Sequence, residues 1–207
     1  MTMTSSSTMR MSAMSSMVSG AAKRVIPDDV TAAEPVLAAL LYAPRHALRL
    51  HQLAAALSGW AYMEAVEELL DCQCLPRYGY TCTEVYTTAE ELVLAGYLKR
   101  SQHGYQLAKI EEGERAARLL EEADLSTRLL RYLVNIYARL TELEAVLHLY
   151  YTIIGYHCGQ LSAKLGEAEE RREELACSML RKGVITRDMF WRIARIAPEE
   201  VCGGDGA

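Results

Sequence analysis

The stretch from Arg77 to Leu107 constrains the fold more than any other part of this 207-residue chain. Its apolar residues recur at helical spacing up to Gly96, and glycine is a common residue just beyond the end of a helix. An apolar pair, a polar segment from Lys99 to His103 and a second apolar segment follow. This order predicts an amphipathic helix and then a small β-hairpin that turns at Gly104.

Other segments on either side complete a domain. Helical spacing is found at residues 31–43, 48–59, 60–70 and 113–123. Thr31 and Glu34 form a capping pattern, and Pro44 and Gly59 are expected to end the first two helices. The segment CQCLPRYGYT, residues 72–81, is expected to be a loop. Helices followed by a helix and a hairpin are typical of a winged helix-turn-helix domain, which we predict for residues 31–123.

The chain beyond residue 124 is predicted to be helical. One helix is expected at 125–140 and a short one at 187–197, and Thr141 and Glu144 form a capping box between them. A run of residues spaced by three and four then predicts one helix of about 40 residues, with the seam of a coiled coil or an extended bundle helix. The seam residues are Leu143, Leu147, Tyr150, Ile154, His157 and Leu161.

This seam predicts a homodimer, because a small domain cannot cover the apolar stripe of so long a helix. The alternative is a break at Gly155 or Gly166, after which the pieces fold back into a monomeric bundle. His148 and His157 lie on the predicted long helix, where we interpret them as interface histidines and not as catalytic residues. The predicted fold class is mainly α with a small β-hairpin, and four regions are expected. They are a disordered tail (1–30), the winged-helix domain (31–123), a helical dimerisation region (124–198) and a flexible tail (199–207).

Charge and composition limit the classes of function. The formal net charge is −5, and residues 31–110 carry six basic and eight acidic side chains, so a nucleic-acid surface must be a local patch. Seventeen Arg against five Lys, with Asn135 as the single Asn, indicate a thermophilic source. The sequence has neither an apolar run long enough to span a membrane nor the pattern of a signal peptide. A cytoplasmic protein without a membrane partner is expected.

Two parts of the chain resemble archaeal and phage-associated winged-helix proteins related to the Panacea antitoxin-like group. The first is RLHQLAAAL, residues 49–57, and the second runs from the aromatic–glycine segment at Tyr78 to Leu98. The segment IEEGERAARLL, residues 110–120, and the hairpin before it are also similar to winged-helix regulators of the MarR and PadR type. The first family has a proline directly after the glycine of the aromatic–glycine segment, whereas in this chain Tyr80 follows Gly79. The resemblance implies a winged helix with a regulatory or antitoxin-like role.

The candidate function is binding of double-stranded DNA by a transcription regulator. Cations at a hairpin tip can contact phosphates, and polar side chains of a helix can contact bases. The candidate DNA-binding residues are Arg45, Arg49, Gln52, Arg77, Thr83, Thr87, Lys99, Arg100, Gln102 and His103. The helix directly before the hairpin has no cation on its expected outer face, which holds Thr83, Glu84, Thr87, Thr88 and Glu91. The alternative is therefore a protein-interaction module, antitoxin-like or scaffolding, on the same fold.

The six cysteines and five histidines predict no cofactor. Cys72, Cys74 and Cys82 could hold zinc with His103, but the spacing differs from that of a zinc knuckle. Buried apolar cysteines are the favoured interpretation, and disulfides are the alternative for a hyperthermophile. Phosphate loops, nucleophile elbows and paired histidines on a helix are absent from the sequence, so no catalytic residue, no metal and no enzyme activity are predicted.

Overall fold

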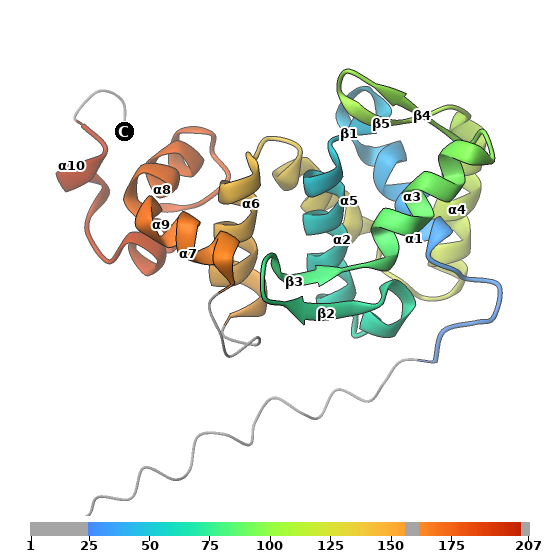
Figure 1. The fold of residues 1–207 in the computed structure, drawn as a ribbon, viewed down its shortest axis with the longest axis horizontal. Helices are drawn as coiled ribbons and strands as arrows, with labels where there is room; N and C mark the ends of the chain where they lie inside the picture. Colours follow the sequence, from blue (N-terminus) through green and yellow to red (C-terminus); the bar gives the residue numbers. More distant parts are fainter. Residues whose placement is uncertain (1–24, 156–161, 204–207) are drawn as a thin grey trace, which may run out of the picture.

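The computed structural model describes residues 25–155 and 162–203, and it confirms a mainly helical chain with a small antiparallel sheet (Figure 1). The first part, up to residue 123, consists of helices, a three-stranded sheet and a separate two-stranded hairpin. Its helices are α1 (Ala33–Tyr42), α2 (Leu50–Glu64), α3 (Glu84–Leu94) and α4 (Ile110–Glu122). Its sheet consists of β1 (Ala47–Leu48), β4 (Leu98–Ser101) and β5 (Gly104–Leu107), in the order β1-β5-β4.

The predicted hairpin is the pair β4–β5. Gly96, at φ +77°, follows the end of α3, and Leu98 then starts the hairpin. The polar segment is shorter than expected, because β4 continues to Ser101 and leaves Gln102 and His103 as the turn. β1 was not predicted, since two residues are too few to show an alternating pattern. It pairs Leu48 with Tyr105 and so extends the hairpin into a sheet.

The prediction that Gly59 ends a helix is wrong. α2 runs through this position to Glu64, and Gly59 is buried. A Cβ atom at Gly59 would lie 3.0 Å from Ile153 Cδ1 and 3.3 Å from Leu149 Cδ1. The glycine is therefore needed for close packing against the C-terminal part of the chain, and not for a turn.

The segment predicted as a loop at residues 72–81 is a second β-hairpin. A 3-10 turn at Glu67–Leu70 leads into β2 (Cys72–Leu75), which pairs in antiparallel fashion with β3 (Gly79–Cys82). Pro76 and Gly79 made the segment resemble a loop, but they flank the turn of the hairpin. In Figure 1 this hairpin lies at the lower edge of the molecule, and β4–β5 lies at the upper edge.

The long helix predicted from Thr141 to Lys182 is also wrong. α5 (Thr127–Tyr137) confirms the helix expected before it, and four short helical pieces then follow within the described residues. They are α6 (Glu142–Leu149), a π-helical turn (Tyr150–Ile154), α7 (Ala163–Glu170) and α8 (Arg172–Arg181). Figure 1 shows these pieces and α9 (Arg187–Ala194) folded back on one another, which matches the broken helix of the alternative.

Local conformation accounts for the breaks. Gly155 has φ +60° and ψ −144°, which ends the π-helical turn, whereas Gly166 lies inside α7. Ser162 starts a new helix by accepting a hydrogen bond from the Leu165 backbone amide at 3.1 Å. Arg171, at φ −111°, separates α7 from α8. A capped start after a glycine therefore interrupts the apolar rhythm that had predicted a continuous seam.

The predicted dimer contacts consequently serve the chain's own core. Leu147 and Ile154 are 0% and 5% exposed, and Leu143 and Tyr150 are half-buried. The other two seam residues, His157 and Leu161, lie outside the described residues. The prediction of a homodimer thus loses the coiled-coil seam on which it was based.

The C-terminal segment is more ordered than predicted. α10 (Pro198–Val201) lies inside the region expected to be a flexible tail, and Cys202 forms a disulfide with Cys177 of α8. The predicted N-terminal tail, up to residue 24, lies outside the described residues. Among the described helices, none combines the length and hydropathy needed to cross a membrane.

Candidate nucleic-acid interface

α3 presents the face on which base contacts were predicted. Thr87 and Glu91 are exposed, and Thr83 and Glu84 are half-buried. Thr88, expected on this outer face, is 5% exposed. It lies three residues after Val85 and four before Leu92, so helical geometry places it on the buried side. The exposed face of α3 is therefore acidic, with Thr87 as its predicted base-contacting side chain.

The two wing cations, Lys99 and Arg100, lie on opposite faces of the sheet. Arg100 pairs with Tyr105, which is 8% exposed and faces the core. Lys99 pairs with Gln106 on the other face. Because side chains alternate along a strand, Arg100 is directed toward α3 and Lys99 toward solvent.

Arg100 is engaged with Glu90 of α3. Its guanidinium donates to one carboxylate oxygen of Glu90, and the Tyr105 hydroxyl donates to the other. These hydrogen bonds, first from Tyr105 and then from Arg100, lower the pKa of the Glu90 carboxyl. The predicted phosphate contact is therefore partly neutralised by a carboxylate of the adjacent helix. Sequence analysis missed Glu90, because its approach to Arg100 depends on the turn at Gly96.

A group of cationic and polar side chains surrounds the β4–β5 turn and the start of α2. The Gln106 side chain donates to the Arg45 carbonyl oxygen at 3.4 Å, and Gly104 packs against the backbone of Leu48 and Arg49. A Cβ at Gly104 would lie 2.7 Å from Arg49 Cα, so the turn can approach α2 this closely only with glycine. We call this group the turn patch, and all its members are exposed. It consists of Arg45, Arg49, Lys99, Gln102 and His103.

Gln52, another predicted DNA contact, is a structural residue. It is 9% exposed, and its amide nitrogen donates to the carbonyl oxygens of Ala138 and Leu140 at 3.1 and 3.2 Å. Its amide oxygen accepts from the Arg49 backbone amide at 3.0 Å, and it thereby caps α2. The prediction was wrong because the carbonyl groups at the end of α5 already occupy this side chain.

Arg77 is separated from the turn patch. It lies in the turn of the β2–β3 hairpin, where its guanidinium is 5.3 Å from the centre of the Tyr78 ring. Its carbonyl oxygen accepts from the Lys164 backbone amide at 3.0 Å, which places it beside α7. The structure thus brings together five of the ten predicted residues in the turn patch and leaves Arg77 on another part of the surface.

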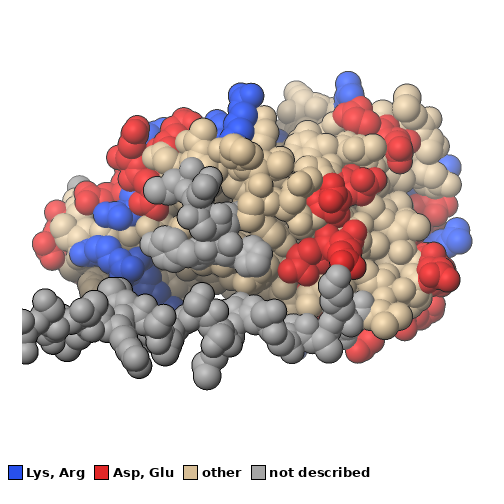
Figure 2. Space-filling view, turned by 60° about the horizontal axis from the view of Figure 1, so that its bottom comes forward, with Lys and Arg blue, Asp and Glu red and all other residues tan. Residues whose placement is uncertain are grey.

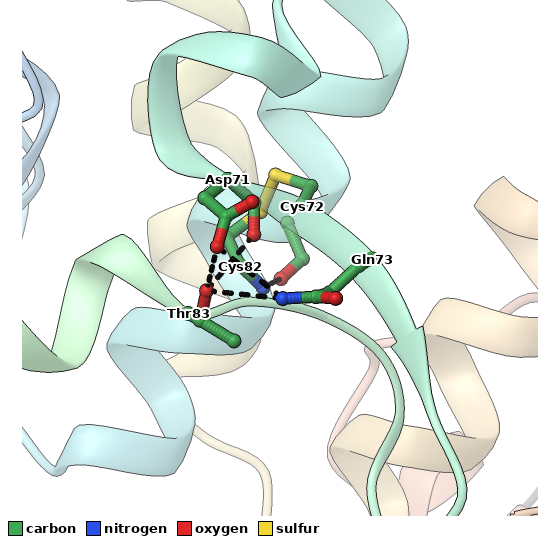
Figure 3. The surroundings of a disulfide bond; sticks show 6 residues. Asp71, Cys72, Gln73, Cys82 and Thr83 are labelled. Carbon is green, nitrogen blue, oxygen red and sulfur yellow. Dashed lines mark hydrogen bonds between the residues drawn. A yellow bond between two sulfur atoms is a disulfide. The ribbon is translucent and has the colours of Figure 1, made fainter.

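The start of α3 is held by the β2–β3 hairpin (Figure 3). The Thr83 backbone amide and hydroxyl donate to the Asp71 carbonyl oxygen at 3.1 and 3.2 Å, and the hydroxyl also donates to the Asp71 carboxylate. The Gln73 amide donates to the same carboxylate at 3.2 Å. Thr83 therefore fastens the helix to the hairpin and is less available as a base contact than its predicted role requires.

The surface around this hairpin is acidic. Residues 64–91 contain seven acidic side chains and one basic side chain, Arg77. In the right half of Figure 2, which shows the underside of the N-terminal part, Asp and Glu outnumber Lys and Arg. Carboxylates repel phosphates, so this acidic surface is unfavourable for a nucleic-acid backbone.

The cysteines form disulfides in place of the favoured apolar, reduced state. Cys72 is bonded to Cys82, and Cys74 is also disulfide-bonded. These sulfur atoms are not available as the thiolate ligands that the zinc alternative requires, because a cysteine in a disulfide carries no thiolate.

Comparisons with protein-family models, curated proteins and solved structures gave no match.

Proposed function

We propose that residues 31–123 form a winged-helix domain that binds double-stranded DNA, in the manner of a transcription regulator. The order of elements supports this, because α2 and α3 lie between β1 and the β4–β5 hairpin, which is the position of a wing. The observation that carries the proposal is the turn patch, whose cations adjoin both this hairpin and the start of α2. Backbone amides at a helix start favour an anion at the same place.

Binding in this geometry uses two kinds of contact. Arg45, Arg49 and Lys99 neutralise phosphates, and Thr87 on the exposed face of α3 reaches base edges. With only three such cations, affinity is expected to be weak and measurable at low ionic strength, and the slope of log affinity against log salt should be about three units.

Replacing both Arg49 and Lys99 by alanine should weaken duplex binding. Each lost phosphate contact is expected to reduce the slope of log affinity against log salt by about one unit. Fluorescence anisotropy with a labelled random duplex, titrated at several salt concentrations, measures both quantities. Arg77→Ala is the matched control, because it removes an exposed arginine outside the turn patch. Equal salt slopes for the double variant and the native protein would contradict the proposal.

Glu90→Gln should strengthen duplex binding. Loss of the carboxylate charge releases Arg100 from its ion pair, and the free guanidinium can then contact a phosphate. The salt slope is expected to increase by about one unit in the same titration. Glu173→Gln changes the charge equally on exposed α8 and serves as the control. Unchanged binding by Glu90→Gln alongside a normal melting temperature would show that Arg100 does not contact DNA.

A protein-interaction module is the second candidate, and the acidic surface favours it. The exposed face of α3 carries Glu84 and Glu91, and Leu94 at its end is 88% exposed. An apolar side chain among carboxylates suits a basic protein partner better than a phosphate backbone.

Charge reversal on α3 distinguishes the two candidates. Under the DNA proposal, Glu84→Lys with Glu91→Lys should increase duplex affinity, because it removes repulsion and adds cations. Under the second candidate the same variant should lose a stoichiometric basic partner that the native protein captures from its host. Gain of duplex binding with no such partner lost would exclude the protein-interaction alternative.

A further inference from the structure

The disulfide between Cys72 and Cys82 closes the β2–β3 hairpin at the point where α3 begins. Cys72 is the first residue of β2, and Cys82 is the last residue of β3 and the second residue before α3. The two cysteines are register partners across the hairpin (Figure 3). The crosslink is therefore located at the junction between the hairpin and the helix.

Non-covalent contacts converge on the same junction. The Cys82 backbone amide donates to the buried Ser58 hydroxyl of α2 at 3.2 Å, and Thr83 bonds to Asp71 beside Cys72. Asp71 has φ +46°, a conformation that a non-glycine residue holds only when its surroundings enforce it. These contacts require the two ends of the hairpin to stay together, which is the constraint that the disulfide supplies.

α3 depends on this junction because it lacks an ordinary cap. Thr83 is its N-cap residue, yet within the described residues its side chain makes no capping bond to the helix. The hydroxyl is instead engaged with Asp71. In the other helices with a Ser or Thr N-cap, such as α5 and α9, the hydroxyl accepts from an amide of the first turn. The first turn of α3 is thus held by the hairpin and not by its own cap.

We propose that the Cys72–Cys82 disulfide is a thiol-sensitive tether that sets the position of α3 and thereby controls the interaction of its exposed face. The consequence for DNA rests on the proposed function. A dithiol reductant supplies the chemistry: its thiolate attacks the half-buried Cys72 sulfur, and Cys82 leaves as a thiolate. The second thiol of the reductant, as thiolate, then displaces Cys72. Two protein thiols and one oxidised reductant result, with two electrons and two protons transferred.

The position of the crosslink makes this a specific site and not a general stabiliser. Cys177–Cys202 joins α8 to the segment after α10, remote in the chain from α3. Both disulfides close loops, of sequence separation 10 and 25, and both restrict the unfolded chain. Of these two disulfides, Cys72–Cys82 is the one that adjoins α3, so Cys177–Cys202 provides a control, and the disulfide of Cys74 in the same hairpin is left intact in both cases.

The test compares the full-length native protein with Cys72→Ser/Cys82→Ser and Cys177→Ser/Cys202→Ser. Hydrogen exchange of the α3 amides, measured relative to those of α5, should be about tenfold faster in the first variant and unchanged in the second. Duplex affinity should fall about tenfold in the first variant alone. Native protein treated with dithiothreitol, which also reduces the disulfides of Cys74 and Cys177, should show at least the acceleration of α3 exchange seen in the first variant. Equal α3 protection in the two variants would overturn the proposal.

Two further measurements keep the outcome unambiguous. Thr83→Val retains the disulfide and removes the hydroxyl bonds to Asp71, so it should accelerate α3 exchange in the same direction even if the cysteine variant does not fold. If the oxidised native protein binds no duplex at low salt, the proposed function fails, and the exchange data still decide the tether. Faster α3 exchange without any DNA binding would assign the tether to a protein partner's site.

Discussion

Leu147→Ala is expected to destabilise the folded protein by about 2–5 kcal/mol. Leu147 is 0% exposed within a single chain, where it belongs to the core around α6. Its truncation removes apolar contacts and leaves a cavity that the surrounding helices fill only in part. Urea unfolding monitored by circular dichroism measures the loss, and the midpoint should not depend on protein concentration.

Leu143→Ala is the informative control. In the coiled-coil interpretation Leu143 and Leu147 are equivalent seam positions, and unfolding would be coupled to dissociation. In the structure Leu143 is half-buried, so its truncation should cost clearly less than that of Leu147. A midpoint that rises with protein concentration, with equal losses at both positions, would restore the intermolecular seam.

Local signals explain which elements could be predicted. α3, the stop at Gly96 and the β4–β5 hairpin depend on apolar spacing and on the glycine with φ +77°, all between Glu84 and Leu107. α5 and α9 are similar cases, since Ser126 and Thr186 cap them directly. The residues within and next to these elements are enough to predict them, and tertiary packing only adds to their stability.

Tertiary contacts explain the errors. Gly59 has the residue type of a helix stop, but its role is to let Leu149 and Ile153 approach α2. The rhythm from Leu143 to Leu161 is compatible with one long helix or with short helices that share a core. Periodicity is the same in both cases, and the choice depends on whether a second surface is available in the same chain.

In the candidate site too, local signals were predictable and tertiary contacts were not. The proximity of Arg45 and Arg49 to the hairpin depends on the pairing of β1 with β5. The wing cations were predictable as a group, because a polar segment between two strands must be exposed. Their individual roles were not, because strand alternation directs Arg100 toward Glu90 and Lys99 toward solvent. Gln52 is not available for the predicted DNA contact, because its amide donates to carbonyl groups 86 and 88 residues away. No local sequence pattern indicates these partners.

Acidification is expected to remove about 3 kcal/mol of stability as the pH falls from about 6.5 to about 4, through His148 alone. His148 is 3% exposed, and its Nδ1 atom lies 3.2 Å from the hydroxyl groups of Tyr137 and Thr152. Burial lowers its pKa from 6.5 to about 4. The folded state thus holds a neutral imidazole, whereas the unfolded chain takes up a proton below pH 6.5. The buried neutral imidazole therefore costs no stability above pH 6.5, and the free energy of unfolding decreases as the pH falls below that value.

Glu144 acts in the same direction at lower pH. Burial by itself would raise the pKa of this carboxyl, but hydrogen bonds from Lys182, Ser178 and Thr141 outweigh burial and lower it. The Lys182 ammonium lies 2.6 and 2.8 Å from the two carboxylate oxygens. A lowered pKa in the folded state means that the stabilisation is present above the unfolded value and is lost as the pH falls through the folded one. As the pH falls, stability is therefore lost first through His148 and then, at lower pH, through Glu144.

His148→Gln separates the two contributions. Glutamine keeps an acceptor for the Tyr137 hydroxyl but does not titrate, so most of the slope between pH 6.5 and 4.5 should disappear while the loss below pH 4.5 remains. The free energy of unfolding in urea, measured at half-unit pH steps, tests this, with exposed His103→Gln as the control that keeps the native slope. Burial also lowers the pKa of His51, which leaves a smaller slope in this window. A slope as steep in His148→Gln as in the native protein would mean that the imidazole of His148 is hydrated and charged in the folded protein. That result would contradict the burial of His148 against Tyr137.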